Sequence, residues 1–310
     1  MKRQFRRYLL ALGIAAGAAP AVLADGPAFT SIDYPGSAST QTWGVNNRGD
    51  IVGFYSLPDK SSHGFLLKAD GTFTSVDYPG SAYTLVNGIN NHGDMVGEYA
   101  LTAAGTDPHH GFLLTSDGTF SSYDYPGAAG SGGVGVTTLG NILGYYVAAD
   151  KSNHAFLLSG GNYTTADIPG VATTVANGIN RCGDIVGGYP DANNVSHAFL
   201  VSEGVMTTID FPGATFTTAT GSNPCGQIVG RYTDAAKVNH GFLLRGGQFS
   251  TIDFPDAAYT GATAINANGD ITGRYRGADG VFHGFLLTGF QPPCAAGAST
   301  QASPRLPADQ

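Results

Sequence analysis

The pattern of apolar and polar positions repeats along most of this chain. A five-residue stretch, His-Gly/Ala-Phe-Leu-Leu/Val, begins at six places: His63, His110, His154, His197, His240 and His283. Successive copies are 47, 44, 43, 43 and 43 residues apart. The Phe-Leu-Leu part is apolar on both faces of a strand, so it needs cover on both sides. Neighbouring copies of the repeat would supply that cover.

A second strand-like piece ends each repeat. It first reads Phe-Thr-Ser-Ile-Asp-Tyr-Pro-Gly, and its copies begin at Phe29, Phe73, Phe120, Tyr163, Met206 and Phe249. Apolar residues alternate with small polar residues, which is typical of a strand with one exposed face. A proline ends every copy and cannot donate to a strand ladder, so we expect this piece to be an edge strand.

Two more strands lie between the edge piece and the histidine motif. Gly44-Val-Asn-Asn leads into a tight turn, 47–50, which Ile51-Val-Gly-Phe-Tyr follows. Gly together with Asn or Asp favours such hairpin turns. The same turn chemistry accounts for the tripeptide Arg48-Gly-Asp without an adhesion role. Repeat three has Thr137-Thr-Leu-Gly-Asn in place of the usual turn sequence, so we expect an irregular hairpin there.

Four short strands repeated about every 40 to 50 residues are typical of β-propellers. The chain begins with an isolated edge piece at Phe29, continues with five full repeats, and ends near Leu287 after three strands. We therefore predict an all-β fold, a six-bladed β-propeller of four-stranded blades. The N-terminal strand 29–34 would complete the last blade and close the ring. An open stack of repeats would give no reason for complementary halves at the two ends.

Two copies of the motif, at His154 and His197, read His-Ala-Phe. Together with the accompanying Gly-Ile-Asn-Asn-x-Gly-Asp-Ile-Val-Gly pattern, they make the chain similar to the HAF-repeat family of predicted bacterial extracellular proteins, over about residues 29–287. This resemblance implies secretion and a β-propeller-like fold. It implies no established reaction and no catalytic residues.

The first 24 residues have the features of an export signal. Basic residues between Lys2 and Arg7 precede an uncharged stretch rich in Leu and Ala, and Val22-Leu-Ala suits cleavage. A membrane anchor is the alternative, although the apolar stretch is short and contains Gly and Pro. We divide the chain into a signal peptide (1–24), a propeller (25–290) and a disordered tail (291–310). We expect a secreted protein, periplasmic or extracellular, with no membrane insertion after processing.

The net charge limits the classes of molecule that the chain is expected to bind. The whole chain has 15 Lys and Arg, 23 Asp and Glu, and a formal charge of −8. Removing residues 1–24 removes four basic residues, so the charge becomes 11 − 23 = −12. Such a surface repels phosphate backbones, which argues against nucleic acid as a partner. We expect a monomer whose ligand is a protein or a carbohydrate.

Three cysteines bear on the fold. Cys182 and Cys225 occupy equivalent positions in neighbouring repeats, 43 residues apart. After export they either form a disulfide between repeats or remain thiols in turns that lie too far apart for one. Cys294 lies beyond the last repeat, and the spacing assigns it no partner.

The six repeat histidines allow two interpretations. Imidazoles bind metals, but one histidine in every repeat is typical of a scaffold, and sites far from a ring axis are too spread to share one ion. We therefore expect a structural role and no metal. An aspartate lies four residues after the start of each edge piece, and we expect it to pair with the histidine. These aspartates are Asp33, Asp77, Asp124, Asp167, Asp210 and Asp253.

The loop before each histidine also contains an aspartate. These residues are Asp59, Asp107, Asp150, Asp191, Asp234 and Asp279. On one face of a propeller they could bind Ca²⁺, a sugar or a cationic ligand. The alternative is ordinary turn aspartates on a solvated rim, because no loop has the alternating Asp/Asn pattern of a calcium loop.

Residues that break the repeat are the better place to look for a binding site. The position after the glycine of the Ile-Val-Gly strand holds Glu98, Arg231 and Arg274 in three repeats, and Trp43 is the only tryptophan. A Glu and two Arg could bind a carboxylate or a sugar. The alternative is that they are variable surface residues.

These observations support two hypotheses about function. The first is a secreted, non-enzymatic propeller that binds a protein or a carbohydrate on its loop face. The second is an exported hydrolase or lyase that acts on a sugar or lactone, with Ca²⁺ as its candidate cofactor. The sequence contains no nucleophile elbow or phosphate loop, and it assigns no catalytic residue. Asymmetric charged residues around the channel would favour catalysis, whereas a ring of repeated Asn, Ser and Thr would favour a scaffold or a binding protein.

Overall fold

The structure is a computed structural model that describes residues 7–9, 26–102, 108–290 and 293–294. All regular elements among these residues are β-strands, and none of the described residues forms a helix long and apolar enough to cross a membrane. The strands are β1 (Arg7–Leu9), β2 (Ala28–Ile32), β3 (Ser39–Val45), β4 (Ile51–Ser56), β5 (Ser62–Leu67), β6 (Phe73–Val76), β7 (Tyr83–Ile89), β8 (Met95–Ala100), β9 (His110–Leu114), β10 (Phe120–Tyr123), β11 (Gly130–Val136), β12 (Ile142–Val147), β13 (Asn153–Ser159), β14 (Asn162–Thr165), β15 (Val175–Ile179), β16 (Ile185–Pro190), β17 (Ser196–Ser202), β18 (Val205–Ile209), β19 (Phe216–Ser222), β20 (Ile228–Thr233), β21 (Asn239–Arg245), β22 (Gln248–Ile252), β23 (Tyr259–Ile265), β24 (Ile271–Arg276) and β25 (Phe282–Thr288).

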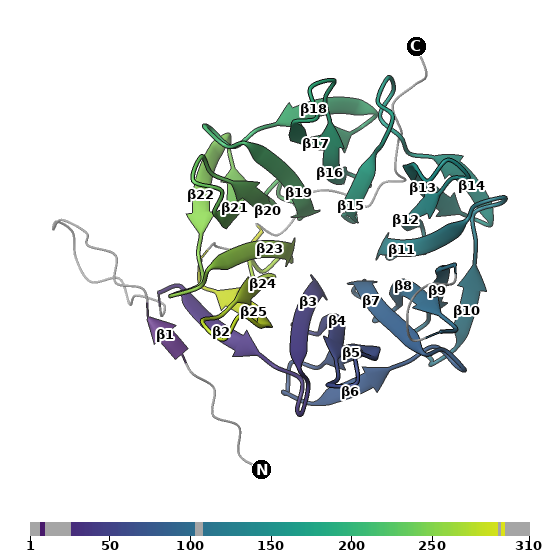
Figure 1. Cartoon of the computed structure of the whole chain (residues 1–310), viewed down its shortest axis with the longest axis horizontal. Coiled ribbons are helices and arrows are strands. Elements are labelled where there is room, and N and C mark those ends of the chain that lie inside the picture. Colours follow the sequence, from purple (N-terminus) through teal and green to yellow (C-terminus); the bar gives the residue numbers. More distant parts are fainter. Residues whose placement is uncertain (1–6, 10–25, 103–107, 291–292, 295–310) are drawn as a thin grey trace, which may run out of the picture.

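The strands pair antiparallel in consecutive groups of four. Units 1 to 5 are β3–β6, β7–β10, β11–β14, β15–β18 and β19–β22, and unit 6 contains β23, β24, β25 and β2. The described residues therefore form six four-stranded units, which lie in a ring in Figure 1. Single parallel pairs, Ser62 with Tyr83 and Asn239 with Tyr259, join some neighbouring units. The hydrogen-bonded sheets consequently contain nine, eight, four and four strands.

Strand β2 closes unit 6 although it comes from the other end of the chain. Phe29 lies opposite Leu287, and Ser31 lies opposite Phe285. The strand ends at Ile32 rather than at the predicted residue 34, because the Tyr34 amide leaves the ladder and donates to Thr40 Oγ1 at 2.9 Å. On its other edge, β2 pairs with the short strand β1. The rest of the predicted signal peptide lies outside the described residues.

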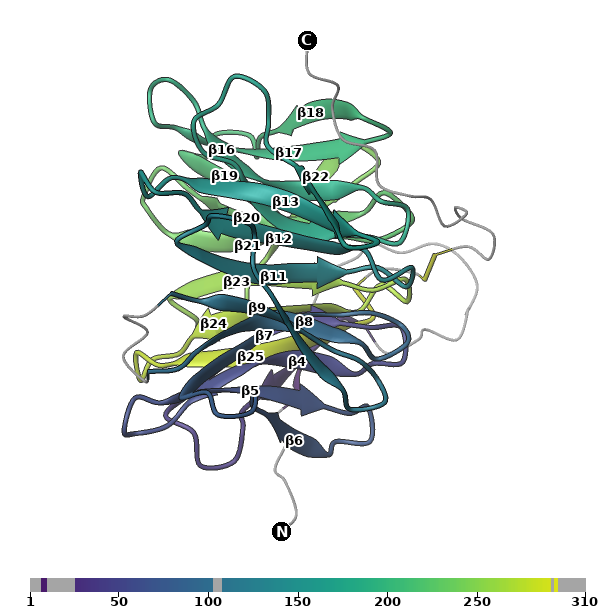
Figure 2. The ribbon, with the colours of Figure 1, turned by 90° about the vertical axis from the view of Figure 1, so that its right-hand side faces the viewer.

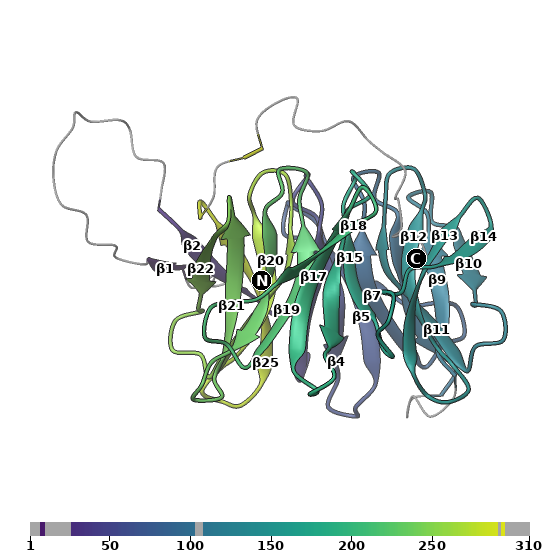
Figure 3. The ribbon, with the colours of Figure 1, turned by 90° about the horizontal axis from the view of Figure 1, so that it is seen from above.

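Each unit has the same radial order. The first strand is innermost and the fourth strand is outermost (Figure 1). Residues of all six first strands line a common cavity, the central channel. Seen from the side, the connections gather on two opposite faces (Figure 2, Figure 3). We call the face with the turns between first and second strands the Asn face. We call the opposite face, with the loops between second and third strands and the crossings between units, the loop face.

The repeated phenylalanine forms the centre of every unit. The phenylalanine of each His-x-Phe motif is fully buried; the six are Phe65, Phe112, Phe156, Phe199, Phe242 and Phe285. Burying a side chain of this size contributes about 1.5–3 kcal/mol of folding free energy relative to leaving it in water. The both-faced apolar pattern of the motif therefore reflects packing between units.

The inner strands approach one another closely, which requires small residues. A Cβ on Gly88 would lie 2.7 Å from the carbonyl oxygen of Val134, and one on Gly178 would lie 2.7 Å from that of Thr220. Every inner strand also contains a bulge one residue before this position. The bulged residues line the channel; they are Trp43, Asn87, Val134, Asn177, Thr220 and Thr263.

Stacked aromatic rings link neighbouring units. The residue before the proline of each edge piece packs on the tyrosine that ends the second strand of the next unit. Five such pairs have parallel rings with centroids 3.6–3.8 Å apart: Tyr34–Tyr55, Tyr78–Tyr99, Tyr125–Tyr146, Phe211–Tyr232 and Phe254–Tyr275. Ile168 holds the equivalent position in the remaining link, where it is buried without a ring. Packing of these rings buries apolar area between neighbouring units.

A ring of asparagines holds the Asn face together. The side-chain amide of each turn asparagine donates to the backbone carbonyl of the equivalent residue in the next unit, for example Asn180 to Asn223 at 3.3 Å and Asn223 to Asn266 at 3.1 Å. Asn266 donates to the Asn46 carbonyl at 3.0 Å, so this ring crosses the junction between units 6 and 1. Repeat three has Thr137 instead, and its hairpin nevertheless keeps the regular backbone bonds of the other turns. The predicted irregularity there is therefore wrong.

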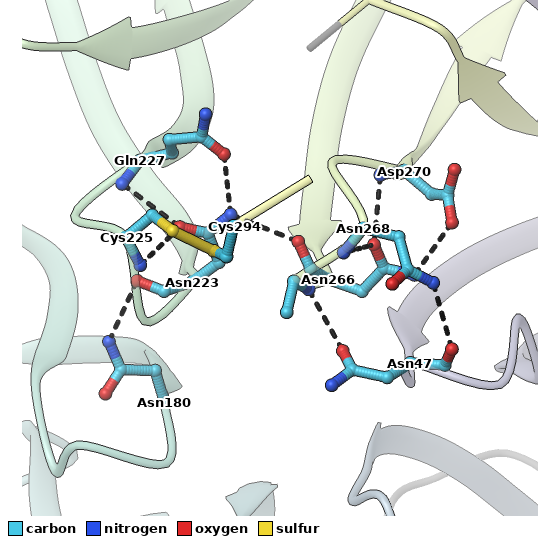
Figure 4. Close-up of a disulfide and its surroundings, with 10 residues drawn as sticks. Asn47, Asn180, Asn223, Cys225, Gln227, Asn266, Asn268, Asp270 and Cys294 are labelled. Carbon is cyan, nitrogen blue, oxygen red and sulfur yellow. Dashed lines mark hydrogen bonds between the residues drawn. A yellow bond between two sulfur atoms is a disulfide. The ribbon is translucent and has the colours of Figure 1, made fainter. Parts of the chain in front are cut away.

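The cysteine pairing matches neither alternative drawn from the sequence, a Cys182–Cys225 disulfide or two thiols at these positions. Cys225 forms a disulfide with Cys294, with Cα atoms 5.7 Å apart, and Cys182 is not disulfide-bonded (Figure 4). The Cys294 amide also donates to the carbonyl of Ala267 at 2.7 Å. The chain after the last strand thus returns to the Asn face beside Cys225, which equivalent spacing of cysteines cannot reveal. The remainder of the predicted disordered tail, apart from Pro293 and Cys294, lies outside the described residues.

Candidate functional site

A pocket opens at the loop face where the symmetry of the ring is broken. It has a volume of about 250 Å³ and lies among the inner ends of units 4, 5 and 6 and the first strand of unit 1. Trp43 of β3, Arg231 of β20 and Arg274 of β24 line it together. Three of the four residues that the sequence singled out therefore meet at one place. Phe216 and Tyr259 add further rings to its wall.

The two arginines are held against aromatic rings. The guanidinium carbon of Arg274 lies 4.9 Å from the centre of the Trp43 ring, and that of Arg231 lies 4.6 Å from the centre of the Phe216 ring. Both guanidinium carbons lie 5.8 Å from the centre of the Tyr259 ring, so the two arginines share this ring as a neighbour. Cation–π contacts of this kind contribute about 0.5–2 kcal/mol and fix the planes of the guanidinium groups.

Neutral side chains are the hydrogen-bond acceptors of these arginines. Arg231 Nη1 donates to Asn239 Oδ1 at 2.7 Å, and Arg274 Nη1 donates to Gln41 Oε1. Arg274 Nη2 lies 3.5 Å from the hydroxyl of Tyr259. Burial lowers the pKa of Arg231 because the pocket replaces part of its water, and the nearby charge of Arg274 acts in the same direction. The pocket therefore holds two positive charges whose hydrogen-bond acceptors are all neutral.

The space in the pocket depends on Gly188. Gly188 occupies the position in unit 4 that Arg231 and Arg274 occupy in units 5 and 6, so no side chain fills the site there. A Cβ at this position would lie 2.8 Å from Thr218 Oγ1. The pocket is thus the place where one repeat lacks the side chain that the next two provide.

Glu98 belongs to a separate cluster. It is a buried residue on β8 of unit 2, where it accepts hydrogen bonds from the hydroxyls of Tyr83 and Tyr145 and lies 3.3 Å from His109 Nδ1. Burial and the nearby carboxylate of Glu98 raise the pKa of both tyrosines. Glu98 is not among the residues that line the pocket.

The loop aspartates act mainly within their own turns. Asp59, Asp150, Asp191, Asp234 and Asp279 each accept a backbone N–H from two or four residues later, and hydrogen bonds within the loops lower the pKa of all five. Asp107 lies outside the described residues. Among the described residues, no three His, Cys, Asp or Glu side chains lie together where they could hold a metal ion. The geometry of this part of the chain supports the turn role and adds nothing to the Ca²⁺ hypothesis.

Each repeat histidine contacts the aspartate of the neighbouring edge piece. The Nδ1–carboxylate distances are 2.6–2.9 Å for His63–Asp77, His110–Asp124, His154–Asp167, His197–Asp210, His240–Asp253 and His283–Asp33. The contact joins the third strand of a unit to its outer strand, and in unit 6 it joins the two ends of the chain. This geometry agrees with a structural role.

Sequence reasoning missed Phe216, Tyr259 and Gln41. A signal for two of them was available, because the first residue of the inner strand is aromatic only in units 2, 5 and 6, where it is Tyr83, Phe216 or Tyr259. These are the same units that carry Glu98, Arg231 and Arg274. The aromatic residue and the charged residue therefore vary together from repeat to repeat. Gln41 had no such signal, because it approaches Arg274 only through closure of the ring.

Comparison with known proteins identifies the fold. No protein-family model matches the chain, and no curated protein sequence matches it. The resemblance to the HAF-repeat family therefore stays a prediction.

Three solved structures show the likeness. AofleA from Arthrobotrys oligospora has a TM-score of 0.56 at 14% identity, over 84% of this chain and 86% of its own. The SapL1 lectin, solved with alpha methyl fucoside, has a TM-score of 0.53 at 11% identity, over 84% of this chain and 98% of its own. A gluconolactonase from Xanthomonas campestris has a TM-score of 0.52 at 12% identity, over 84% of this chain and 89% of its own. At these identities the likeness concerns the fold alone, and this chain has a β-propeller-like, all-β fold.

Proposed function

We propose that this chain is a secreted, six-bladed β-propeller that binds a carbohydrate, without catalysis, in the pocket at its loop face. The six four-stranded units are the blades, and β2 completes the last one. Residues 1–24 direct export and are then removed. Unit 6 keeps its four strands after that removal, because β1 pairs only with the outer edge of β2.

The convergence of aromatic rings, guanidinium groups and side-chain amides in one pocket carries this proposal. Sugars present apolar C–H faces, which pack on rings such as Trp43 and Tyr259, and hydroxyl groups, which bond to polar side chains. Arg231 and Arg274 supply N–H donors around the same space, and the Asn177 side chain, whose amide donates to Thr218 Oγ1 and the Ala219 carbonyl, lies beside them. A volume of about 250 Å³ suits one or two sugar rings better than a protein segment.

The composition of the pocket favours binding over hydrolysis. Its lining includes no Asp, Glu or His that could serve as a general acid or base. Both a lectin solved with a fucoside and a gluconolactonase share the fold, so fold alone does not separate the two functions. The repeated asparagines on the Asn face have a scaffold role, which leaves the loop face as the asymmetric surface.

Trp43 provides the test, because it is the only tryptophan and it lines the pocket. We expect a glycan-array screen to identify saccharides, and those saccharides to change the intrinsic fluorescence of Trp43 on titration. Tyr259→Ala should weaken the affinity about tenfold or more, through the loss of a buried aromatic contact. The matched control is Tyr83→Ala, which removes the equivalent tyrosine of unit 2 from outside the pocket.

Two results would contradict the proposal. One is a screen without any saccharide ligand, and the other is an affinity that Tyr83→Ala reduces as much as Tyr259→Ala does. Mass spectrometry of the bound saccharide after incubation should show it intact. Cleavage or ring opening of the saccharide would support the hydrolase hypothesis instead.

A further inference from the structure

The pocket contains two arginines and no acidic residue. Among the described residues, neither Arg231 nor Arg274 has a carboxylate within salt-bridge distance, and the acceptors of both are neutral. This is unusual in a chain with 23 acidic and 15 basic residues, where carboxylates are the more abundant partners. The positive charge of the pocket is therefore left for something outside the protein to balance.

The cost of this arrangement indicates a functional role. An arginine stays protonated at any physiological pH, so the desolvation cost of burying its charge is offset only by hydrogen bonds and ring contacts unless an anion is present. Arg231 and Arg274 are both half-buried, and desolvation lowers the pKa of Arg231. Trp43 adds a second cost, because its buried indole N–H has no hydrogen-bond partner among the described residues. A buried charge and an unpartnered buried N–H both destabilise the fold, and a bound ligand that pairs with them would offset that destabilisation.

Resting on the proposed carbohydrate function, we propose that the saccharide is acidic and that Arg231 and Arg274 together bind its carboxylate or sulfate group. Guanidinium groups match the planar, two-oxygen edge of these anions and form charge-assisted hydrogen bonds with them. Because both guanidinium carbons lie 5.8 Å from the centre of the Tyr259 ring, an anion bound by the two arginines would lie near a ring on which the sugar can pack. The site would thus recognise both the negative charge and the apolar face of the saccharide.

The acidic surface of the protein does not prevent this. The loop aspartates nearest in sequence, Asp191, Asp234 and Asp279, contact His197, His240 and His283 on the third strands of their units. Fields from exposed charges are screened over about 8 Å at physiological ionic strength. At the channel mouth, the two arginines therefore dominate the electrostatic interaction with an anion. The loop aspartates lower only the rate at which the anion approaches.

Trigalacturonate and its fully methyl-esterified form make the probe and its matched control, because they share the sugar rings and differ in charge. We expect trigalacturonate to change Trp43 fluorescence at concentrations at least tenfold lower than the methyl ester. Arg231→Gln and Arg274→Gln should each remove most of this difference. Arg276→Gln should leave it, because Arg276 is an exposed arginine on the same strand as Arg274. Circular dichroism establishes that each variant is folded.

The outcomes separate this inference from the proposed function. Equal affinity for the two saccharides, insensitive to either pocket variant, would overturn the acidic specificity and leave carbohydrate binding in place. Binding of acetate or sulfate as tight as that of trigalacturonate, at matched ionic strength, would support the anion site and contradict the carbohydrate function. If trigalacturonate, its ester, a sulfated disaccharide and both simple anions all leave Trp43 fluorescence unchanged, both proposals are wrong.

Discussion

At the scale of single residues, the repeated histidine and aspartate form the same contact between strands in every unit. The histidine and aspartate of the repeat lie too far apart in sequence to be paired by a local rule, yet the repetition of both residues in every unit predicts the contact. The contact is present in all six units. In units 4, 5 and 6 a loop aspartate also approaches the other ring nitrogen, so each of these imidazoles lies between two carboxylates.

This arrangement predicts a pH-dependent stability. The hydrogen bond that His283 makes to Asp33 raises the pKa of His283, and the bond that His197 makes to Asp210 raises the pKa of His197, while burial opposes both shifts. A histidine with a raised folded-state pKa stabilises the fold fully below its unfolded value of about 6.5. That contribution is lost as the pH rises through the raised value. We expect about 0.2–1 kcal/mol per pair, because the pairs are partly exposed.

Urea denaturation at about pH 6 and about pH 8.5 measures this effect. The wild-type midpoint should fall at the higher pH, and His283→Gln should flatten the dependence. His92→Gln is the control, because His92 is an exposed turn residue. If both His283→Gln and His92→Gln leave the pH dependence of the urea midpoint unchanged, the His–Asp contact does not have this role.

At the scale of elements, period and turn chemistry were sufficient to place the strands. The edge pieces, the hairpins around Gly49 and Gly93, and the buried phenylalanines all follow from the repeated pattern. The cysteine pairing did not follow, because Cys294 lies outside the repeat and its position depends on a loop that obeys no period. Equivalent positions such as Cys182 and Cys225 are related by symmetry, and symmetry gives no information on distance.

The disulfide makes a testable contribution to stability. It joins residues 69 positions apart, and closing a loop of this length is worth about 4 kcal/mol in the chain-entropy description of disulfides. Cys294→Ser should lower the free energy of unfolding by up to this amount, as should a reducing agent acting on the wild type. Cys182→Ser is the control, and we expect it to change the value by less than about 1 kcal/mol. Equal losses in the two variants would refute the Cys225–Cys294 pairing.

At the scale of the whole molecule, the ring explains why the candidate site was only partly predictable. Trp43 and Arg274 are separated by most of the chain and meet because unit 1 lies beside unit 6. The phase of the repeats predicted that neighbourhood, since the first strand completes the last unit. The identity of the remaining wall residues could not be predicted, because it depends on which side chains point across the channel mouth.

The closure of the ring predicts where the molecule is most sensitive to substitution. Phe29 anchors β2 through edge contacts with Phe254 and Phe285, with ring centres 5.2 and 5.4 Å away. Phe29→Ala should cost about 3–5 kcal/mol, the usual range for a buried phenylalanine. The equivalent Phe249 is only partly buried and is joined to its partner strand by a short turn, so Phe249→Ala should cost less. Chemical denaturation of the two variants compares them, and equal losses would contradict a special role for β2.

The pairing of β2 with β25 also sets the order of events during synthesis. Ile32 leaves the ribosome some 252 residues before its partner Gly284. At about 5–20 residues per second, this interval is about 13–50 s. During that time residues 28–32 have been made but β25, their partner in unit 6, has not, and an unpaired edge can join the wrong neighbour. The first segment of the ring to be made is thus among the last to become protected, and we expect nascent-chain misassembly to begin there.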